Sequence, residues 1–255
     1  MSTGRPDEFY VGYSPRAPRG LAQAVRVRTA MLYLAVTTAA VLLTQAHGLR
    51  PAARFEYGTE VELAGTLVER PYVHLIVPRP GRVGSLPAGS SYPLVAPWKH
   101  GADALVAGLD GQSVRLRATL VYRDGWVVAE LVPGSLAIEP GIRPVQAEVH
   151  ALGRHTLVGE IVDSKCFFGV MSPGEQKSHR ACAVRCISGG IPPVLCVRGE
   201  AGAACYLMLV SADGHAVNQA VLDFVAEPVE ISGEIERHGE VLVLFADPAS
   251  YRRLE

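Results

Sequence analysis

The stretch that decides the fold is Leu63-Ala64-Gly65-Thr66-Leu67-Val68, because it returns later in the chain as Leu157-Val158-Gly159-Glu160-Ile161-Val162. Both stretches belong to segments in which apolar residues alternate with others, the pattern of a half-buried β-strand. A glycine in the middle of a strand suits the sharply coiled strands of a small closed barrel. The repeat therefore predicts two related β modules in tandem.

The residues around the two copies also follow one another in the same order. An alternating strand at 114–120 or 229–235 leads through a turn into a return strand at 126–131 or 241–245. Tyr92 aligns with Tyr206 on a middle strand, and short helical stretches are expected at 102–109 and 216–225. A five-stranded barrel with one such helix is OB-like. An immunoglobulin-type sandwich needs more strands than either copy offers. We therefore predict a mainly β protein with two tandem OB-like small barrels.

The copies differ where the cysteines lie. We predict a first module over residues 55–140 without cysteines and a second module over residues 150–255. Copy one has Tyr72 where copy two has Cys166, and a Pro/Gly loop at 78–91 where copy two carries a longer insertion. The Cys/His insertion spans 166–205 and includes a short helix inserted in the second barrel. Because the scaffold occurs once without this insertion, the insertion indicates an acquired site.

The N-terminal region predicts a membrane anchor. Residues 29–49 carry no charge, and about 20 such residues suffice to cross a bilayer as a helix. Arginines in the preceding residues 1–28 place that tail in the cytoplasm and the barrels in the periplasm, so the protein would be single-pass in a bacterial inner membrane. A cleaved signal peptide and a buried core helix are the alternatives.

Composition excludes some functions. Of the 255 residues 49% are hydrophobic, which is incompatible with wholesale disorder. The net charge of −1 gives no basic face for a nucleic acid, so we expect no nucleic-acid partner. All five cysteines lie between Cys166 and Cys205, which indicates a local site rather than a disulfide framework.

The cysteine cluster has the donor set of a metal centre. Residues 175–187 are compatible with a helix that places His179, Cys182 and Cys186 on one face, and Cys166 at a strand end can close over that face. Three thiolates and an imidazole suit Zn(II), Cu(I) or an iron centre. We therefore predict a transition-metal site formed by Cys166, His179, Cys182 and Cys186.

Two alternatives remain open for the thiols. We predict a disulfide between Cys196 and Cys205, which flank a Gly/Ala loop, whichever interpretation holds for the other thiols. Exported cysteines usually pair, so the remaining three could also be structural. Cys166 would then bond Cys182 or Cys186, and the cysteines would brace a non-catalytic scaffold or docking module. The third interpretation is a thiol–disulfide redox protein.

The residues before Cys166 have two interpretations. Asp163 would orient His179, and Lys165 would lower the pKa of the Cys166 thiol. A solvated strand end is the more common origin of such a sequence. Met171 offers a soft sulfur donor, although a loop methionine more often serves packing. Five further histidines are expected at the surface: His74, His100, His155, His215 and His238.

The motif also resembles a signature of uncharacterised membrane-anchored bacterial envelope proteins. It runs from Asp163-Ser-Lys-Cys166 through His179-Arg-Ala-Cys182-Ala-Val-Arg-Cys186-Ile-Ser-Gly-Gly-Ile-Pro-Pro193. The resemblance covers mainly the second module and the anchor. The family carries no established activity, and the functional expectation comes from the combination of a single-span anchor with a cofactor-like cluster. That combination indicates a periplasmic metal- or cofactor-binding subunit that serves electron transfer or metal handling. The expected partner is an envelope oxidoreductase or electron-transfer complex, and the chain itself is more an accessory subunit than a stand-alone enzyme.

Overall fold

The computed structural model describes residues 17–48, 53–78, 89–140, 147–199 and 203–254. Contacts divide the chain into two compact units, Met1–Pro51 and Ala52–Glu255. Every strand among the described residues belongs to the second unit, so the two β modules share one body.

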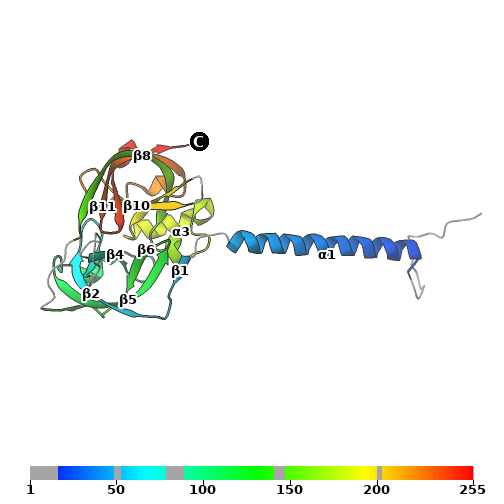
Figure 1. The fold of residues 1–255 in the computed structure, drawn as a ribbon, viewed down its shortest axis with the longest axis horizontal. Coiled ribbons are helices and arrows are strands. Elements are labelled where there is room, and N and C mark those ends of the chain that lie inside the picture. Colours follow the sequence, from blue (N-terminus) through cyan, green and yellow to red (C-terminus); the bar gives the residue numbers. More distant parts are fainter. Residues whose placement is uncertain (1–16, 49–52, 79–88, 141–146, 200–202, 255) are drawn as a thin grey trace, which may run out of the picture. The chain divides into compact units, whose positions relative to one another are not determined.

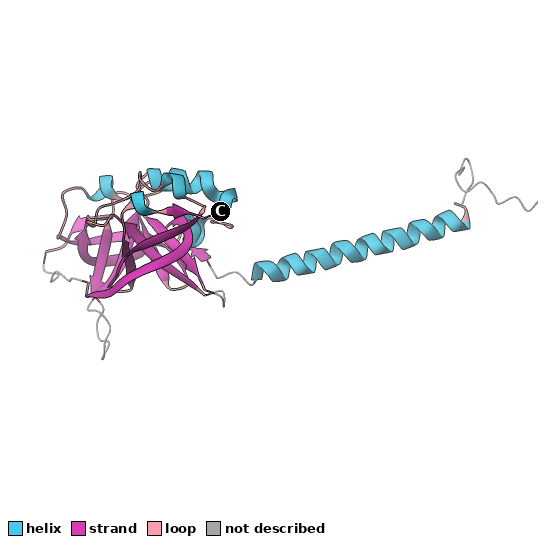
Figure 2. Ribbon diagram, turned by 90° about the horizontal axis from the view of Figure 1, so that it is seen from above, coloured by secondary structure: helices cyan, strands magenta, loops and turns pink. Residues whose placement is uncertain are grey.

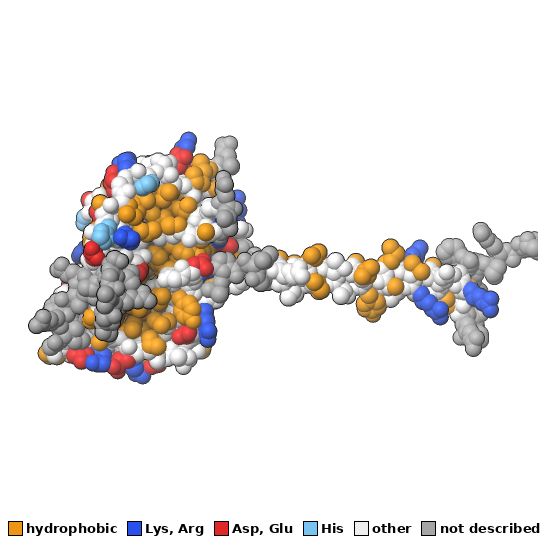
Figure 3. Space-filling model, viewed as in Figure 1, with side chains coloured by type: hydrophobic (Ala, Val, Ile, Leu, Met, Phe, Trp, Pro, Cys, Tyr) orange, Lys and Arg blue, Asp and Glu red, His pale blue; other side chains and the backbone are white. Residues whose placement is uncertain are grey.

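The first unit contains one long apolar helix, α1, over Arg19–Gly48. Over Arg19–Ala46 it is long and apolar enough to cross a membrane. Figure 3 shows hydrophobic side chains along it and basic side chains near its first residues. The helix begins ten residues earlier than the predicted span at 29–49, because the arginine-bearing residues before Thr29 continue the same helix. Residues 1–16 of the predicted cytoplasmic tail lie outside the described residues.

The first sheet closes on itself as a five-stranded barrel (Figure 1). Its strands pair in the order β2-β3-β4-β6-β5 and back to β2, with β4 parallel to β6 and every other pair antiparallel. Two short strands, β1 and β7, pair with β5 outside the ring. The strands are β1 (Ala53–Phe55), β2 (Val61–Val68), β3 (His74–Pro78), β4 (Gly89–Val95), β5 (Ser113–Arg123), β6 (Trp126–Leu131) and β7 (Ala137–Ile138).

The second sheet closes in the same order, β8-β9-β10-β12-β11 and back to β8. Counted along the chain, its third and fifth strands are β10 and β12, and they pair in parallel as β4 and β6 do. Strand β13 pairs with β11 outside the ring. The strands are β8 (Val149–Asp163), β9 (Pro193–Arg198), β10 (Ala204–Val210), β11 (Pro228–His238), β12 (Val241–Phe245) and β13 (Arg252–Arg253). Two tandem closed barrels are therefore present, as the sequence repeat predicts.

The repeated glycines have the same role in both barrels. Gly65 pairs with Val114, and Gly159 pairs with Val229. Each glycine therefore lies on the first strand of its barrel, where that strand pairs with the fourth strand along the chain. A Cβ atom at Gly65 would lie 2.3 Å from the carbonyl oxygen of Ile76, and one at Gly159 would lie 2.5 Å from that of Cys196. The first strand therefore approaches the second strand too closely for any side chain at this position.

The predicted alignment of the third strands is one residue out of register. Ser91 lies opposite Ile76, and Tyr206 lies opposite Cys196, which makes Ser91 and not Tyr92 the counterpart of Tyr206. A shift of one residue moves a side chain to the other face of a sheet. Tyr92 accordingly packs on the core of the first barrel, whereas Tyr206 packs between the barrels.

The helices are shorter or placed differently than predicted, apart from α3. The stretches expected at 102–109 and 216–225 contain only α2 (Asp103–Val106) and the 3-10 turn η2 (Leu222–Phe224). The cysteine-bearing segment follows the first strand of barrel two and lies between β8 and β9. The sequence comparison instead aligned it with the loop at 78–91 of the first module. Residues 79–88 of that loop lie outside the described residues. Figure 2 shows the helices of the second unit gathered along one side of the strands. The segment contains the π-turn η1 (Cys166–Val170) and α3 (Gln176–Ser188); η3 (Pro248–Ser250) follows near the C-terminus.

Three hydrophobic clusters stabilise the unit. Each barrel has its own core, with Leu67 and Leu116 in the first and Leu195 and Ile231 in the second. A further cluster contains residues of both barrels together with Cys166, Phe167 and Phe168 of η1. The cysteine-bearing segment therefore forms part of the core that joins the barrels.

Candidate metal centre

The π-turn η1 fixes Cys166 between the two barrels. Phe167 and Phe168, which follow it, have no solvent exposure. The Phe168 ring stacks on Trp126 of barrel one at a centroid distance of 5.3 Å, and the Arg123 guanidinium lies 4.1 Å from the centroid of Phe167. These aromatic contacts hold the backbone of Cys166 against the first barrel.

Asp163 organises the start of the site. Its Oδ1 accepts hydrogen bonds from the backbone N–H groups of Cys166 at 2.6 Å and Lys165 at 3.1 Å. Its Oδ2 lies 3.1 Å from Nε2 of His179. Asp163 has no solvent exposure, so the solvated strand end that its sequence more commonly indicates is not what the structure shows. One carboxylate contacts both the Cys166 backbone and the His179 ring; of these two contacts, only the one with His179 was part of the alternative interpretation.

Helix α3 brings the remaining predicted ligands to Cys166. It spans Gln176–Ser188, close to the predicted 175–187, and carries His179, Cys182 and Cys186. The Sγ atom of Cys166 lies 3.8 Å from that of Cys182 and 3.7 Å from that of Cys186. Bonded sulfurs would be about 2.05 Å apart. All three thiols are therefore free, and the Cys166 sulfur contacts the sulfurs of both Cys182 and Cys186.

The donor atoms form two overlapping groups in which every pair lies within 4.8 Å. One group is Cys166, His179 and Cys182, and the other is Asp163, Cys166 and Cys186. Cys166 belongs to both, and no single group contains all four predicted ligands. Because thiolate and imidazole donors bind borderline and soft transition metals, either group has the chemistry to hold such an ion.

Lys165 does not face the thiols. Its Nζ atom lies 2.5 Å from a carboxylate oxygen of Glu130 and donates hydrogen bonds to the carbonyl oxygens of Ala96 at 2.9 Å and Trp98 at 2.7 Å. All these partners belong to barrel one, and Lys165 is 2% exposed. Lys165 is therefore not placed to lower the pKa of Cys166, as one interpretation of the sequence had it. Its ammonium joins the two barrels instead.

The lysine that reaches the thiols is Lys99, in the turn after β4. Its Nζ atom lies 2.7 Å from Sγ of Cys182 and 3.5 Å from Sγ of Cys186. Partial burial opposes the charged form, but the contacts with these sulfurs outweigh it and raise the pKa of Lys99. Sequence reasoning missed Lys99 because it lies in the cysteine-free module, and no local pattern marks it.

The two buried thiols share one hydrogen bond unequally. That bond, together with burial, raises the pKa of Cys166. The same bond lowers the pKa of Cys186, assisted by the Lys99 ammonium against the opposing effect of burial. Cys186 is thus the member of this pair that carries negative charge more readily.

The predicted disulfide between Cys196 and Cys205 is not present, since both thiols are free. On the ladder of β9 and β10, Cys196 lies opposite Tyr206 and Cys205 lies opposite Val197. Successive residues of a strand point to opposite faces, so the two thiols point apart. Cys196 is buried, and burial raises its pKa to about 11, whereas Cys205 is exposed.

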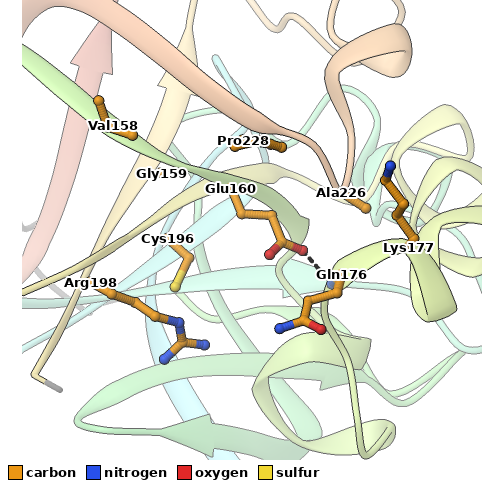
Figure 4. A pocket seen from close by; sticks show the side chains of 9 residues that line it. All are labelled: Val158, Gly159, Glu160, Gln176, Lys177, Cys196, Arg198, Ala226 and Pro228. Carbon is orange, nitrogen blue, oxygen red and sulfur yellow. Dashed lines mark hydrogen bonds between the residues drawn. The ribbon is translucent and has the colours of Figure 1, made fainter. Parts of the chain in front are cut away.

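Cys196 belongs to a pocket of about 490 Å³ beside the start of α3 (Figure 4). Val158, Gly159 and Pro228 give it apolar walls. The Glu160 carboxylate accepts a hydrogen bond from the backbone N–H of Gln176, the first residue of α3. A carboxylate of the protein itself therefore occupies the first N–H group of this helix.

The other candidate donors stay outside both groups. His100, His155 and His215 are exposed as predicted, while His238 is half-buried. His74 also differs from the prediction, since it is half-buried and burial lowers its pKa. Met171 is 44% exposed.

No family model matches this chain, and no curated protein matches it. Its chemistry therefore has to be inferred from these residues themselves.

Proposed function

We propose that this protein is a membrane-tethered periplasmic subunit that binds one transition-metal ion, Zn, Cu or Fe, at Cys166, Cys182, Cys186 and His179. The ion would serve electron transfer or metal handling in an envelope oxidoreductase assembly. The resemblance of the Asp163–Pro193 motif to membrane-anchored bacterial envelope proteins supports that setting, as does a helix suited to an anchor or a signal sequence.

The observation that carries the proposal is the spacing of the sulfurs. Two sulfurs of a tetrahedral centre with metal–sulfur bonds of about 2.3 Å lie about 3.8 Å apart. The two separations from Cys166, 3.8 and 3.7 Å, have this value. The contact of His179 with Asp163 is the usual way in which a ligating imidazole is oriented, with one nitrogen bound to a carboxylate and the other left for the metal.

The barrels provide the frame for this centre. We propose that both are OB-like modules, and that the second has acquired η1 and α3 between its first and second strands. The common strand order, with the third strand parallel to the fifth, supports this assignment. On this proposal the frame folds without ligands, and the cysteine-free first barrel supports that expectation.

The test is the metal content of the full chain, purified in detergent without oxygen or chelator. We expect about one ion per chain in the wild type, and a loss of tenfold or more in Cys182→Ser. Cys205→Ser is the matched control, since it removes an exposed thiol outside the cluster and should leave the metal content unchanged. A wild-type protein that binds no transition metal would refute the proposal.

The same sulfur contacts favour one second candidate, a thiol–disulfide redox protein. Cys166 is within 3.8 Å of two thiols, so oxidation would join it to either one. Mass spectrometry of the native protein distinguishes the candidates: a disulfide from Cys166 to Cys182 or Cys186 supports redox chemistry and ends the four-ligand proposal.

A further inference from the structure

Lys99 is a residue of barrel one placed against a site whose other members all come from barrel two. Its ammonium contacts the sulfurs of Cys182 and Cys186 at 2.7 and 3.5 Å. The other lysine near the site, Lys165, is occupied by Glu130 and two carbonyl oxygens. Lys99 is thus the cation that faces the sulfurs.

The turn that carries Lys99 is held against the end of α3. At its end, Gly101 N–H donates to the carbonyl oxygen of Gly189 at 2.9 Å. A Cβ atom on Gly189 would lie 2.0 Å from the carbonyl oxygen of Lys99, so only glycine permits this approach of α3. The position of the ammonium is therefore fixed by the docking of the two barrels.

The residue before Lys99 is strained. Trp98 has a φ of 64°, a left-handed conformation that is unfavourable for a bulky side chain, and its indole is 85% exposed. Its carbonyl oxygen accepts the hydrogen bond from buried Lys165. Such strain persists only where the surroundings enforce it, and it is commonly found at functional sites.

We propose that Lys99 is a positioning residue of the metal centre, which donates hydrogen bonds to the Cys182 and Cys186 thiolates while they ligate the ion. This inference rests on the proposed function. Three thiolates and the Asp163 carboxylate place four negative charges around one ion, and the Lys99 ammonium offsets one of them. Hydrogen bonds to ligating sulfurs are a known determinant of the reduction potential of a metal centre.

The sign of the effect follows from electrostatics. A redox metal gains one negative charge when it accepts an electron, and a nearby cation stabilises that reduced state. Lys99 therefore raises the reduction potential of a bound iron. It also lowers the energy of the sulfur lone pairs, so charge transfer from sulfur to a bound Co(II) requires more energy.

The experiment uses the full chain in detergent, loaded without oxygen with Fe(II) or, separately, with Co(II). An electrode withdraws one electron from each Fe(II) and returns one electron to each Fe(III), so that both states are present at equilibrium. At the midpoint potential of the wild type, where its reduced and oxidised iron are equal, the ratio of reduced to oxidised iron in Lys99→Met should be about tenfold lower. Its sulfur-to-cobalt band should move to longer wavelength. Lys99→Arg keeps the positive charge, so its iron ratio and its cobalt band should both lie close to the wild-type values.

The matched control is Lys177→Met. Lys177 lies on α3 and its side chain is 81% exposed, so this variant removes the same charge without touching the sulfurs. It should leave the iron ratio and the cobalt band unchanged. If a metal-loaded Lys99→Met protein matches the wild type in both measurements, or if Lys177→Met shifts them equally, the role of Lys99 is refuted. A wild-type protein that binds neither ion refutes the proposed function, and this inference with it.

Discussion

Within the motif that begins at Asp163, each side chain has a different neighbour. Asp163 turns to His179, Lys165 enters barrel one, and Cys166 meets the other two thiols. Because the chain enters a single π-turn here, these side chains diverge instead of lining one face. The motif therefore joins the metal donors to the contact between the barrels.

Lys165→Met tests the joining role. The substitution leaves the largely buried Glu130 carboxylate and the Trp98 and Ala96 carbonyl oxygens without the ammonium. Breaking a buried ion pair from one side costs on the order of 3–5 kcal/mol, and we expect a loss of that size in the free energy of unfolding by urea. Lys177→Met, on the exposed side of α3, should leave the unfolding midpoint unchanged. Equal midpoints for Lys165→Met and the wild type would contradict this role.

Single residues also show what the sequence could predict about the site. His179, Cys182 and Cys186 were predictable together, since a helical period brings them to one face. Lys99 was not, because its place depends on the docking of one barrel on the other. Cys196 and Cys205 appeared suited to a disulfide across a loop, but the face on which each thiol lies depends on the register of β9 and β10.

At the scale of elements, strands with alternating residues and turn signals were recognisable, whereas β3 and β9 were not singled out. Both are short apolar runs, His74–Pro78 and Pro193–Arg198, without the polar alternation of a half-buried strand. Since β9 follows α3, missing it also displaced the predicted position of the insertion. Helix α3 itself was predictable, because Gly189-Gly190 and Pro192-Pro193 end it clearly.

The two mid-strand glycines give a prediction for both barrels. Gly65→Ala and Gly159→Ala each place a methyl group within 2.5 Å of a carbonyl oxygen of the neighbouring strand. We expect each to lower the free energy of unfolding by about 2 kcal/mol or more. Gly199→Ala is the control, since its nearest contact would be an ordinary 3.6 Å, and it should change stability by less than about 0.5 kcal/mol. Wild-type stability in Gly65→Ala would show that β2 does not approach β3 this closely.

At the scale of the whole molecule, the two barrels form one body around a shared cluster. Trp126 of barrel one and Phe168 of η1 stack within it. The proposed centre is therefore assembled by the docking of two modules, although every predicted ligand belongs to the second. The repeat in the sequence predicted the two barrels but contained no information on the surface that joins them.

The apolar helix α1 gives a prediction for the whole chain. The full protein should remain in the membrane pellet after a carbonate wash, because about 20 uncharged residues of α1 match the thickness of a bilayer. Residues 52–255, which form the second compact unit, should be soluble without detergent. Recovery of a mature protein that starts near His47 would instead establish a cleaved signal sequence.

In the proposed centre three sulfurs and one imidazole hold a single ion, and X-ray absorption at the metal edge measures these neighbours directly. For the full chain purified in detergent with its native metal, we expect about three sulfur neighbours near 2.3 Å and one nitrogen neighbour near 2.0–2.1 Å. The sulfur count should fall to about two in Cys182→Ser that is reloaded with the same metal. A first shell of oxygen and nitrogen alone, with no sulfur neighbour, would refute the proposed centre.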